Sequence, residues 1–328
     1  MSHSFLAAIV VLYFSSTVSQ SLRAQTQTGS IAILVWHESP NDRKALVGLK
    51  RGLFAMGMAS RIKEINVQGD ATMAESELSA IDGSDLAMVV ALGTEAARLA
   101  KRFVKTKPVV FTAVTNPVLA GIAASWQGAG GNLAGNSNWL DRGEMLQAFQ
   151  TAVPKLGKLC VLTSKGNAVS EAEFIEAGEA IRSHGGIKLS RKIVDDPRKL
   201  SDLVAEACRE ADALWIPIDF QLYQEASLNI IVETAKKHRT PIVSSTGRTA
   251  GVGALVVVTV DYEALGLRAA GIINRILVKG DLPGRIPVGR LQSARIIVDL
   301  EAFRSIGQKV PLDLVFKAHR ILGKSLPK

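Results

Sequence analysis

The sequence has few residues of the kinds that build metal or disulfide centres. Only two cysteines, Cys160 and Cys208, occur among its 328 residues. Neither belongs to a Cys-x-x-Cys pair or lies near a histidine cluster, so we predict no metal site and no cofactor. Both lie in apolar segments and are expected to be small buried side chains. A disulfide between them in an oxidising compartment stays open at this point.

Motifs of common enzyme classes are also missing. The five histidines are far apart, and His37-Glu38 is not followed by a second histidine at zinc-protease spacing. No Gly-x-Ser-x-Gly occurs, and the glycines between residues 128 and 135 miss the Gly-x-Gly-x-x-Gly spacing. The pair Asp195-Asp196 precedes a proline and most simply caps a helix. We therefore predict that the protein is not an enzyme.

The positive charge is not concentrated in one place. The formal net charge is +9, but the 39 Lys and Arg are scattered and form no long run interleaved with aromatic residues. A pattern of this kind is typical of a solvated basic surface. We therefore expect no nucleic-acid partner.

No apolar run is long enough to span a bilayer, which needs about 20 residues. The run "FLAAIVVLYF" at residues 5–14 has instead the length of a signal-peptide core, although the preceding "MSHS" lacks Lys and Arg. Small and polar residues follow, and cleavage after Ser21 or Ala24 would suit them, so residues 1–24 are predicted to be a signal peptide. No cysteine follows the run, so we expect an exported, soluble protein without a lipid anchor.

From Ile31 onward, apolar strand-like segments alternate with amphipathic helix-like segments. We predict strands at 31–36, 61–67, 86–93, 108–114, 158–164, 187–194, 213–219, 241–246 and 254–261. We predict helices at 42–58, with Asp42 as its cap, and at 72–82, 94–104, 141–153, 168–186, 197–211, 221–238 and 262–280. A segment at 294–307 and a final helix close the chain. This alternation, which restarts after the 130s, predicts an α/β protein with two lobes, each a parallel sheet covered on both faces.

Several predicted strands end in small polar residues. They end at Gly93–Glu95, Thr115–Pro117, Thr163–Asn167, Asp219, Ser244–Thr246 and Asp261–Tyr262. Each ending alone is more typical of a turn or a cap than of a ligand contact. In open α/β sheets, however, ligands bind outside the carboxyl ends of the strands. Six such endings together favour a ligand site.

The same stretches resemble a known family. The segments are "GLKRGLFAMG", "KPVVFTAVTNPVLAGI", "GGNLAGNS", "ADALWIPID", "HRTPIVSS", "VTVDYEALGLRAAGIINRILVKGDLPGRIPV" and "ARIIVDLEAFRSIGQKVP". In this order, from Ile31 to the C-terminus, they resemble the ABC-transporter substrate-binding family that includes bacterial aromatic amino-acid-binding lipoproteins. The resemblance implies a periplasmic-binding-protein type 1 fold, with two Rossmann-like lobes, a hinge of three crossovers and closure on a small ligand.

The resemblance also implies which residues bind the ligand. The family's Val-Thr-Asp-Pro corresponds to residues 114–117, where Asn116 replaces the acid and removes a negative charge. The other family positions that correspond are Thr94, Ser164, Ser170, Asp219, Asp261 and Tyr262. With the neighbouring strand ends, the predicted ligand-binding residues are Thr94, Glu95, Thr115, Asn116, Ser164, Ser170, Asp219, Ser244 and Asp261.

The chemistry of these residues suits a small zwitterion, although a neutral or anionic ligand stays open. Thr94 and the backbone N–H groups at Glu95 can receive a carboxylate at a helix N-terminus. Asp219 either pairs with an ammonium group or caps the helix expected at 221. Asp261 either contacts the ligand or, as we slightly favour, caps its own helix. Trp36, Phe220 and Tyr223 are candidates for an apolar wall and equally for core positions.

The lobe boundaries and function follow from the resemblance. Lobe 1 is expected to comprise 30–137 with 261–290, and lobe 2 138–260 with 291–328, with hinges near Gly135–Trp139, Val260–Asp261 and Gly289–Gln292. The family implies a monomeric, periplasmic solute-binding protein of an ABC importer that delivers an amino-acid-like ligand to an inner-membrane permease. A ligand sensor that signals to a membrane receptor is the alternative. A transcriptional repressor would need a DNA-binding domain before the first strand.

Overall fold

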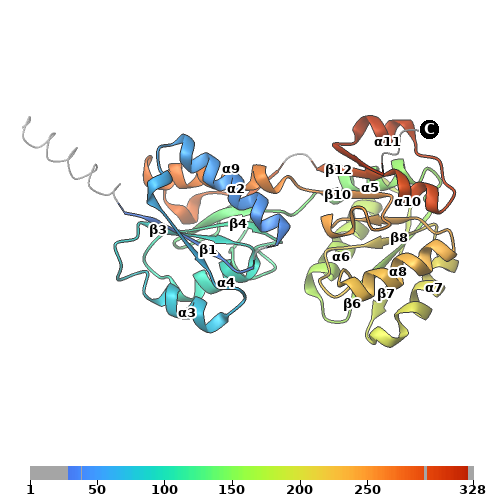
Figure 1. Cartoon of the computed structure of the whole chain (residues 1–328), viewed down its shortest axis with the longest axis horizontal. Coiled ribbons are helices and arrows are strands. Elements are labelled where there is room, and N and C mark those ends of the chain that lie inside the picture. The colour runs from blue at the N-terminus through green and yellow to red at the C-terminus, as the bar shows by residue number, and fades with distance from the viewer. Residues whose placement is uncertain (1–28, 38, 292–293, 324–328) are drawn as a thin grey trace, which may run out of the picture. The chain divides into compact units, whose positions relative to one another are not determined.

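The structure is a computed structural model that describes residues 29–37, 39–291 and 294–323. The described residues form two compact α/β units (Figure 1). Unit 1 consists of the residues up to Asn138 together with Tyr262–Arg290, and unit 2 of Trp139–Asp261 together with the residues from Leu291 on. The chain therefore passes three times from one unit to the other. The predicted signal peptide lies outside the described residues.

Unit 1 is built on a parallel sheet of six strands, within the described residues, in the order β11-β5-β4-β3-β1-β2. The strands are β1 (Ile31–Val35), β2 (Ile62–Asn66), β3 (Met88–Leu92), β4 (Val109–Val114), β5 (Leu133–Ser137) and β11 (Gly289–Arg290). The helices are α2 (Pro40–Ala55), α3 (Ala71–Ser79), α4 (Thr94–Phe103) and α9 (Tyr262–Leu277), with short 3-10 turns η1 (Ala59–Arg61) and η4 (Pro283–Arg285). Helices α2 and α9 cover one face of the sheet, and α3 and α4 the other, as right-handed crossovers require (Figure 1).

Glycines allow α2 and α9 to pack very closely. A Cβ atom at Gly48 would overlap the backbone of Glu263, and one at Gly266 would overlap the backbone of Ala45. Both glycines are buried, so no side chain separates the two helix backbones at these points. The return segment of the chain is thus fixed to the first helix of unit 1 by direct backbone contact.

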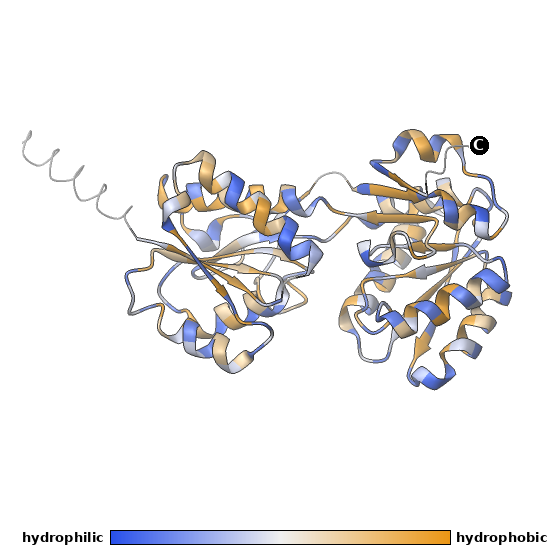
Figure 2. Cartoon of the chain, viewed as in Figure 1, coloured by the Kyte–Doolittle hydropathy of each residue, from blue (hydrophilic) through white to orange (hydrophobic). Residues whose placement is uncertain are grey.

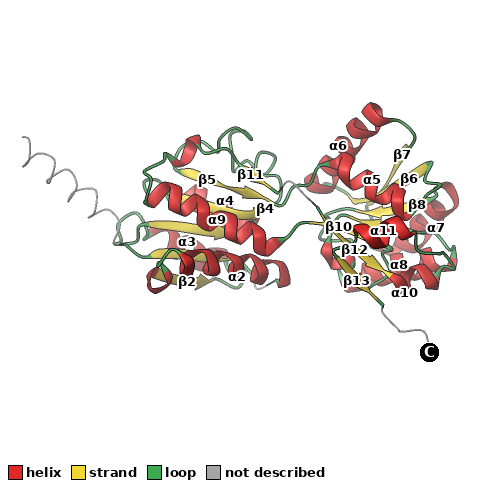
Figure 3. Ribbon diagram, turned by 90° about the horizontal axis from the view of Figure 1, so that it is seen from above, coloured by secondary structure: helices red, strands yellow, loops and turns green. Residues whose placement is uncertain are grey.

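Unit 2 has a sheet of seven described strands in the order β13-β12-β10-β9-β8-β6-β7. The strands are β6 (Lys158–Ser164), β7 (Lys188–Val194), β8 (Ala213–Ile216), β9 (Ile242–Ser244), β10 (Val256–Thr259), β12 (Arg295–Asp299) and β13 (Arg320–Leu322). The helices are α5 (Arg142–Ala152), α6 (Ala168–His184), α7 (Leu200–Glu210), α8 (Glu225–Lys237), α10 (Leu300–Ser305) and α11 (Leu312–Lys317), with 3-10 turns η2 (Pro197–Lys199) and η3 (Gly247–Thr249). Helices α5 and α6 lie on one face of the sheet and α7 and α8 on the other (Figure 3).

The hydrophobic cores lie between these layers. The central strands are apolar, and the outward faces of the covering helices carry most of the polar residues (Figure 2). Strands β1, β3 and β4 are buried along their whole length, which fits the continuous apolar runs of parallel strands covered on both faces. Phe111 in unit 1 and Trp215 in unit 2 are among the largest fully buried side chains. The predicted α/β class is confirmed.

The structure differs from the sequence prediction in three local features. Strand β12 runs antiparallel to β10, with Thr259 opposite Arg295. The chain therefore re-enters unit 2 beside the strand by which it left. The short strands β11 and β13 were not predicted. Helix α8 begins at Glu225, four residues later than predicted, since the preceding residues form a turn.

One capping prediction was also wrong. Ser39, and not Asp42, is the N-cap of α2: its Oγ accepts from the Asp42 N–H (3.1 Å) and donates to the Asp42 carboxylate (2.6 Å). Pro40 fits the first helical position because it has no N–H to leave unpaired. Asp42 thus lies within the first turn of the helix.

Candidate functional site

In unit 1, the carboxyl ends of β1, β3 and β4 meet at one edge of the sheet. The strand order places the topological switch point between β1 and β3, because the chain continues to β2 on one side and to β4 on the other. Helices α2 and α4 begin at this edge, so both present their N-termini there. This edge of unit 1 therefore presents two helix N-termini, with the Asp42 carboxylate in the first turn of α2.

The start of α4 has the geometry of an anion-binding turn. Gly93 is its N-cap and has φ +84°, a conformation that favours glycine. The first hydrogen bond within the helix runs from the Ala97 N–H to the Gly93 carbonyl (3.1 Å). The N–H groups of the preceding residues Thr94, Glu95 and Ala96 lie before this first bond and point out of the helix end. The Glu95 side chain is turned toward Arg98, which it contacts at 3.0 Å.

Thr94 and Thr115 come together at this edge. The Thr115 N–H donates to Thr94 Oγ1 at 3.2 Å, which joins the end of β4 to the start of α4. Asn116 is 7% exposed, has φ +41°, and accepts the Leu119 N–H at 3.0 Å. The Asn116 side chain therefore stabilises the turn after β4, as Asx turns do.

A bulge directs the end of β4. Ala113 has φ +57°, and the pairing of β4 with β5 shifts between Phe111 and Val114. Buried Asn136 accepts from Thr112 Oγ1 (2.9 Å) and the Ala113 N–H (3.3 Å) and donates to a backbone carbonyl of α9 (2.9 Å). Bulges of this kind turn a strand end toward a site. The sequence analysis missed Asn136, although its position inside the apolar "NLAGNS" strand was a usable signal.

In unit 2, two predicted residues, Ser164 and Ser170, bond to the carboxylate of a third, Asp219. Asp219 is fully buried and accepts four hydrogen bonds: from the Ser164 N–H (2.7 Å), Ser164 Oγ (2.8 Å), Ser170 Oγ (2.8 Å) and the Gln221 N–H (3.2 Å). Ser164 ends β6, and Asp219 follows β8. These strands flank the switch point of the unit 2 sheet. The bond to Gln221 lies in a turn, and the N-cap of α8 is Gln224, so the alternative that Asp219 caps a helix beginning at 221 was wrong.

A second buried carboxylate lies next to this cluster and was not predicted. Glu173 is fully buried on α6, and its Oε2 accepts the Ile218 N–H (3.0 Å) and Ser245 Oγ (2.7 Å). Its Oε1 lies 3.0 Å from Nη1 of Arg142, whose side chain is 4% exposed. The only sequence signal was the position of Glu173 one turn after Ser170, on the same face of a helix.

Two further predicted residues serve other contacts. Ser244 is fully buried; its Oγ donates to the Ile216 carbonyl (2.8 Å) and accepts the Thr246 N–H (3.2 Å). Asp261 forms an ion pair with Arg295 at the point where the chain leaves unit 2. Neither residue joins the cluster around Asp219, and their roles in ligand binding stay predictions.

Aromatic side chains stand beside both edges. In unit 1, Trp36 follows β1 and packs edge-on against His37, with ring centroids 5.7 Å apart. In unit 2, Phe220 is 65% exposed and packs edge-on against Tyr223 at 5.9 Å. Burial raises the pKa of the Tyr223 phenol, so it is neutral and can donate a hydrogen bond at physiological pH.

Acids and thiols elsewhere in unit 2 are also shifted. Burial raises the pKa of Glu176, an effect that Arg142 partly offsets. Cys160 and Cys208 are buried free thiols, and burial raises the pKa of each. The described part of the chain brings together no three His, Cys, Asp or Glu side chains that could hold a metal ion. Within the same residues, none of the helices has both the length and the apolar character needed to cross a membrane.

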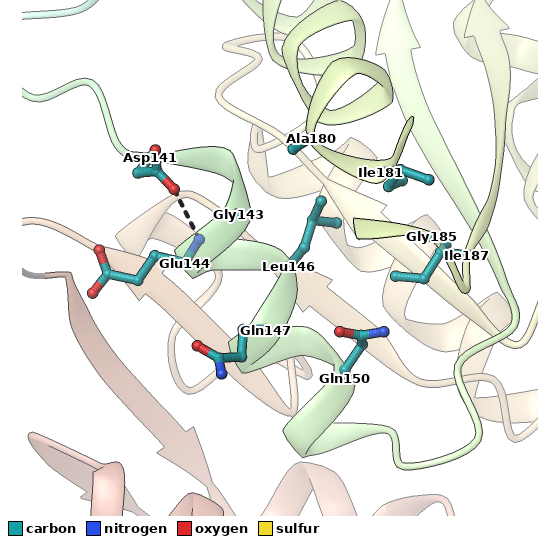
Figure 4. A pocket seen from close by; sticks show the side chains of 10 residues that line it. All are labelled: Asp141, Gly143, Glu144, Leu146, Gln147, Gln150, Ala180, Ile181, Gly185 and Ile187. Atoms are coloured by element: carbon teal, nitrogen blue, oxygen red, sulfur yellow. Dashed lines mark hydrogen bonds between the residues drawn. The ribbon is translucent and has the colours of Figure 1, made fainter. Parts of the chain in front are cut away.

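Two grooves lie away from the strand ends. One, of about 440 Å³, lies between α5 and α6, where Leu146, Ile181 and Ile187 line it together with Gln147 and Gln150 (Figure 4). The other, of about 710 Å³, follows α9 in unit 1. Neither contains a predicted ligand residue.

Comparisons with known proteins identify the family of this chain. The model of the ABC transporter substrate binding protein family matches residues 30–321. The tyrosine-binding protein of Clostridioides difficile (strain R20291) is 26% identical over 281 residues, which are 84% of this chain and 80% of that protein.

Two solved structures are similar over almost the whole described chain. The ABC domain of Streptococcus pneumonia in complex with L-Trp has a TM-score of 0.72 at 22% identity, and the alignment covers 89% of this chain and 100% of that one. A ligand-free, open substrate-binding protein with adhesive properties from Clostridium difficile has a TM-score of 0.80 at 22% identity, with coverages of 90% and 100%. These similarities confirm the predicted periplasmic-binding-protein type 1 fold. Because the family model covers nearly all of the described residues, the chain belongs to the ABC transporter substrate binding protein family.

Proposed function

We propose that this protein is the solute-binding component of an ABC importer and that it captures an amino acid, with aromatic amino acids as the first candidates. The observation that carries the ligand class is the buried Asp219 carboxylate, surrounded by hydroxyl and N–H donors at the switch point of unit 2. The family match supports the transport role. The names of two similar proteins, one tyrosine-binding and one solved with L-Trp, support an aromatic side chain on the ligand.

Each edge would bind a different part of the ligand. The N–H groups at Thr94 and Glu95, with the Thr115 hydroxyl, would receive the carboxylate at the positive end of α4. Asp219 would receive the ammonium group. Because its oxygens already accept four hydrogen bonds, the ammonium would have to replace the hydroxyl of Ser164 or Ser170 as a donor.

The remaining predicted residues would complete the ligand contacts. Asn116 would shape the carboxylate end through its turn, and Ser244 and Asp261 would line the unit 2 side. The aromatic rings of Trp36, Phe220 and Tyr223 would contact the ligand side chain.

The mechanism would be binding by closure. A ligand that contacts both units favours the closed state over the open state by its difference in affinity for the two. The hinges would be the three crossovers, near Gly135–Trp139, Val260–Asp261 and Gly289–Gln292, of which Gln292 lies outside the described residues. The closed protein, a monomer in the periplasm, would deliver the ligand to a permease in the inner membrane.

A thermal-shift screen of the purified protein tests this proposal. The panel would contain the twenty L-amino acids, small carboxylates, sugars, purines and thiamine. A ligand at 100 times its dissociation constant adds about 2.7 kcal/mol to the free energy of unfolding, which is a visible rise in melting temperature. We expect such a rise with L-tyrosine, L-tryptophan or L-phenylalanine. A rise with sugars or purines and with no amino acid would contradict the proposal.

A further inference from the structure

Glu173 connects three separate segments at the carboxyl edge of unit 2. It lies on α6, three residues after Ser170, so both side chains reach the same edge. Ser170 holds Asp219 through its hydroxyl, while Glu173 holds the N–H of the preceding residue, Ile218. Two consecutive residues of the β8–α8 loop are therefore bonded to the same face of α6.

The same carboxylate also holds the end of β9. Glu173 Oε2 accepts Ser245 Oγ at 2.7 Å, and Ser245 Oγ in turn accepts the indole N–H of the buried Trp215 at 3.2 Å. Ser244, the neighbour of Ser245, is one of the predicted ligand residues. One oxygen atom of Glu173 thus joins the loop that carries Asp219 to Ser245, the residue that follows Ser244 at the end of β9.

A fully buried carboxylate needs a compensating charge, and Arg142 supplies it. Arg142 Nη1 lies 3.0 Å from Glu173 Oε1, and the guanidinium stacks on the Trp139 ring, 4.0 Å from its centroid. Arg142 Nε also contacts Glu176 at 3.3 Å. Burying one partner of such a pair without the other is strongly unfavourable, so Arg142 and Glu173 are expected to depend on each other in this position.

We infer that Glu173, held in place by Arg142, is a positioning residue for the ligand edge of unit 2: it fixes the Ile218–Asp219 backbone and Ser245 in the arrangement that receives the ligand. Glu173 does not itself contact the ligand. The identity of that ligand rests on the function proposed above. The contacts of Glu173 are observed in the structure whatever the ligand is.

Glu173→Gln is the most informative variant. A carboxylate has two acceptor oxygens, whereas the amide has one acceptor and one donor group. If the amide oxygen faces Ile218 and Ser245, the amide NH₂ faces the guanidinium of Arg142, donor against donor. If the amide is reversed, the NH₂ faces the Ile218 N–H. Either orientation disturbs the edge with almost no change in side-chain volume.

The matched control is Glu176→Gln. Glu176 lies on the same helix, one turn further on, and contacts the same arginine, but its carboxylate bonds to Trp139 and Arg142 on the side of α5. Should Glu173→Gln fail to fold, the double variant Arg142→Met/Glu173→Gln removes both buried charges together and is the second test.

Two measurements decide the inference. Hydrogen exchange monitored by NMR should show the Ile218 amide exchanging at least about tenfold faster in Glu173→Gln than in the wild type. The Leu214 amide, which bonds to the Pro241 carbonyl inside the sheet, should be unchanged. Titration with L-tyrosine should give a dissociation constant raised by about tenfold or more, whereas Glu176→Gln should match the wild type in both measurements.

Equal exchange of the Ile218 amide in wild type and Glu173→Gln would overturn the inference, as would an unchanged dissociation constant in a variant that does exchange faster. An equal effect of Glu176→Gln would overturn it too, because the loss of any carboxylate beside Arg142 would then be enough to speed the exchange and weaken binding. If wild type binds no amino acid at all, the proposed function fails, and the exchange of Ile218 in the two variants still decides whether Glu173 positions the loop.

Discussion

The two units have similar sheets, but different interactions hold their carboxyl edges in place. In unit 1, the edge is formed by backbone geometry: a glycine with positive φ, a strand bulge, and a hydrogen bond from a backbone N–H to Thr94. In unit 2, two fully buried carboxylates, Asp219 and Glu173, organise the edge.

Under the proposed function, this difference would give the two edges different ligand preferences. Unit 1 offers helix N-termini and N–H groups, which favour an anion. Unit 2 offers carboxylate oxygens, which favour a cation or a hydroxyl donor. An amino acid has one group for each edge. The difference also means that unit 1 should be sensitive to changes in backbone packing and unit 2 to changes in charge.

The largest effect should come from the helix contact in unit 1. Gly266→Val places a side chain against the backbone of α2, so we expect the free energy of unfolding of unit 1 to fall by about 3 kcal/mol. The matched control is Gly271→Ala on the same helix, where a Cβ meets no atom within 4 Å and a gain of about 0.5–1 kcal/mol is expected. Urea unfolding with hydrogen exchange resolved by residue would measure both. An equal loss of stability in unit 2 would contradict the expectation that this contact stabilises unit 1 alone.

Asp219 should show the sensitivity of unit 2 to charge. Asp219→Asn keeps the volume but puts an amide NH₂ among four donors, so we expect a loss of about 2 kcal/mol in stability. Affinity for L-tyrosine should fall by about 100-fold, because the partner of the ammonium group loses its charge. Calorimetric titration would measure the affinity, and urea unfolding the stability. A variant with wild-type affinity would remove Asp219 from the site.

Smaller effects on stability and affinity are expected from Thr94 and Thr115, at the carboxyl edge of unit 1. Thr94→Val preserves the shape of the side chain but removes the acceptor for the Thr115 N–H. We expect a loss of about 1 kcal/mol in stability, and Thr115→Ala should weaken L-tyrosine binding by about tenfold while leaving the fold intact. Urea unfolding would measure the stability of Thr94→Val, and calorimetric titration the affinity of Thr115→Ala. If Thr115→Ala weakened binding more than Asp219→Asn, the proposed division of roles between the edges would be reversed.

The smallest effect is a pH dependence at Glu176. Burial raises its pKa above the ordinary value of 4.5, so the native state binds a proton more tightly than the unfolded state does. The carboxylate therefore costs stability once it ionises. As pH rises from about 4.5 through the raised pKa, the wild type should lose stability relative to Glu176→Gln. Urea unfolding between pH 4 and pH 8 would measure the free energy of unfolding of both proteins. A difference between them that stays constant with pH would contradict this interpretation.

Much of the fold followed from the sequence because parallel strands buried on both faces leave an unambiguous apolar pattern. Strands such as Ile31–Val35 and Met88–Leu92 lie where that pattern predicts. The proximity of Ser164 and Asp219 was also predictable, since parallel strands end at a common edge, whereas Ser170, on α6, was singled out only by the family resemblance.

What could not be predicted depends on tertiary contacts. Arg142 and Glu173 are 31 residues apart, and nothing in their local sequence distinguishes a buried ion pair from two solvated charges. The edge strand β13 is only three residues long, too short for a periodic signal. Before α8, the Asp219 side chain accepts the Gln221 N–H and the Asp219 carbonyl accepts the Leu222 N–H, so these residues form a turn and the helix starts later.

The most direct test of the central claim is an NMR titration of the ¹⁵N-labelled protein with L-tyrosine. The account predicts that the largest shifts in amide resonance fall at Thr94–Ala96 in unit 1 and at Ser164, Ser170 and Asp219 in unit 2. Shifts concentrated instead around Leu146 and Ile181, in the groove between α5 and α6, would place the ligand elsewhere and contradict it.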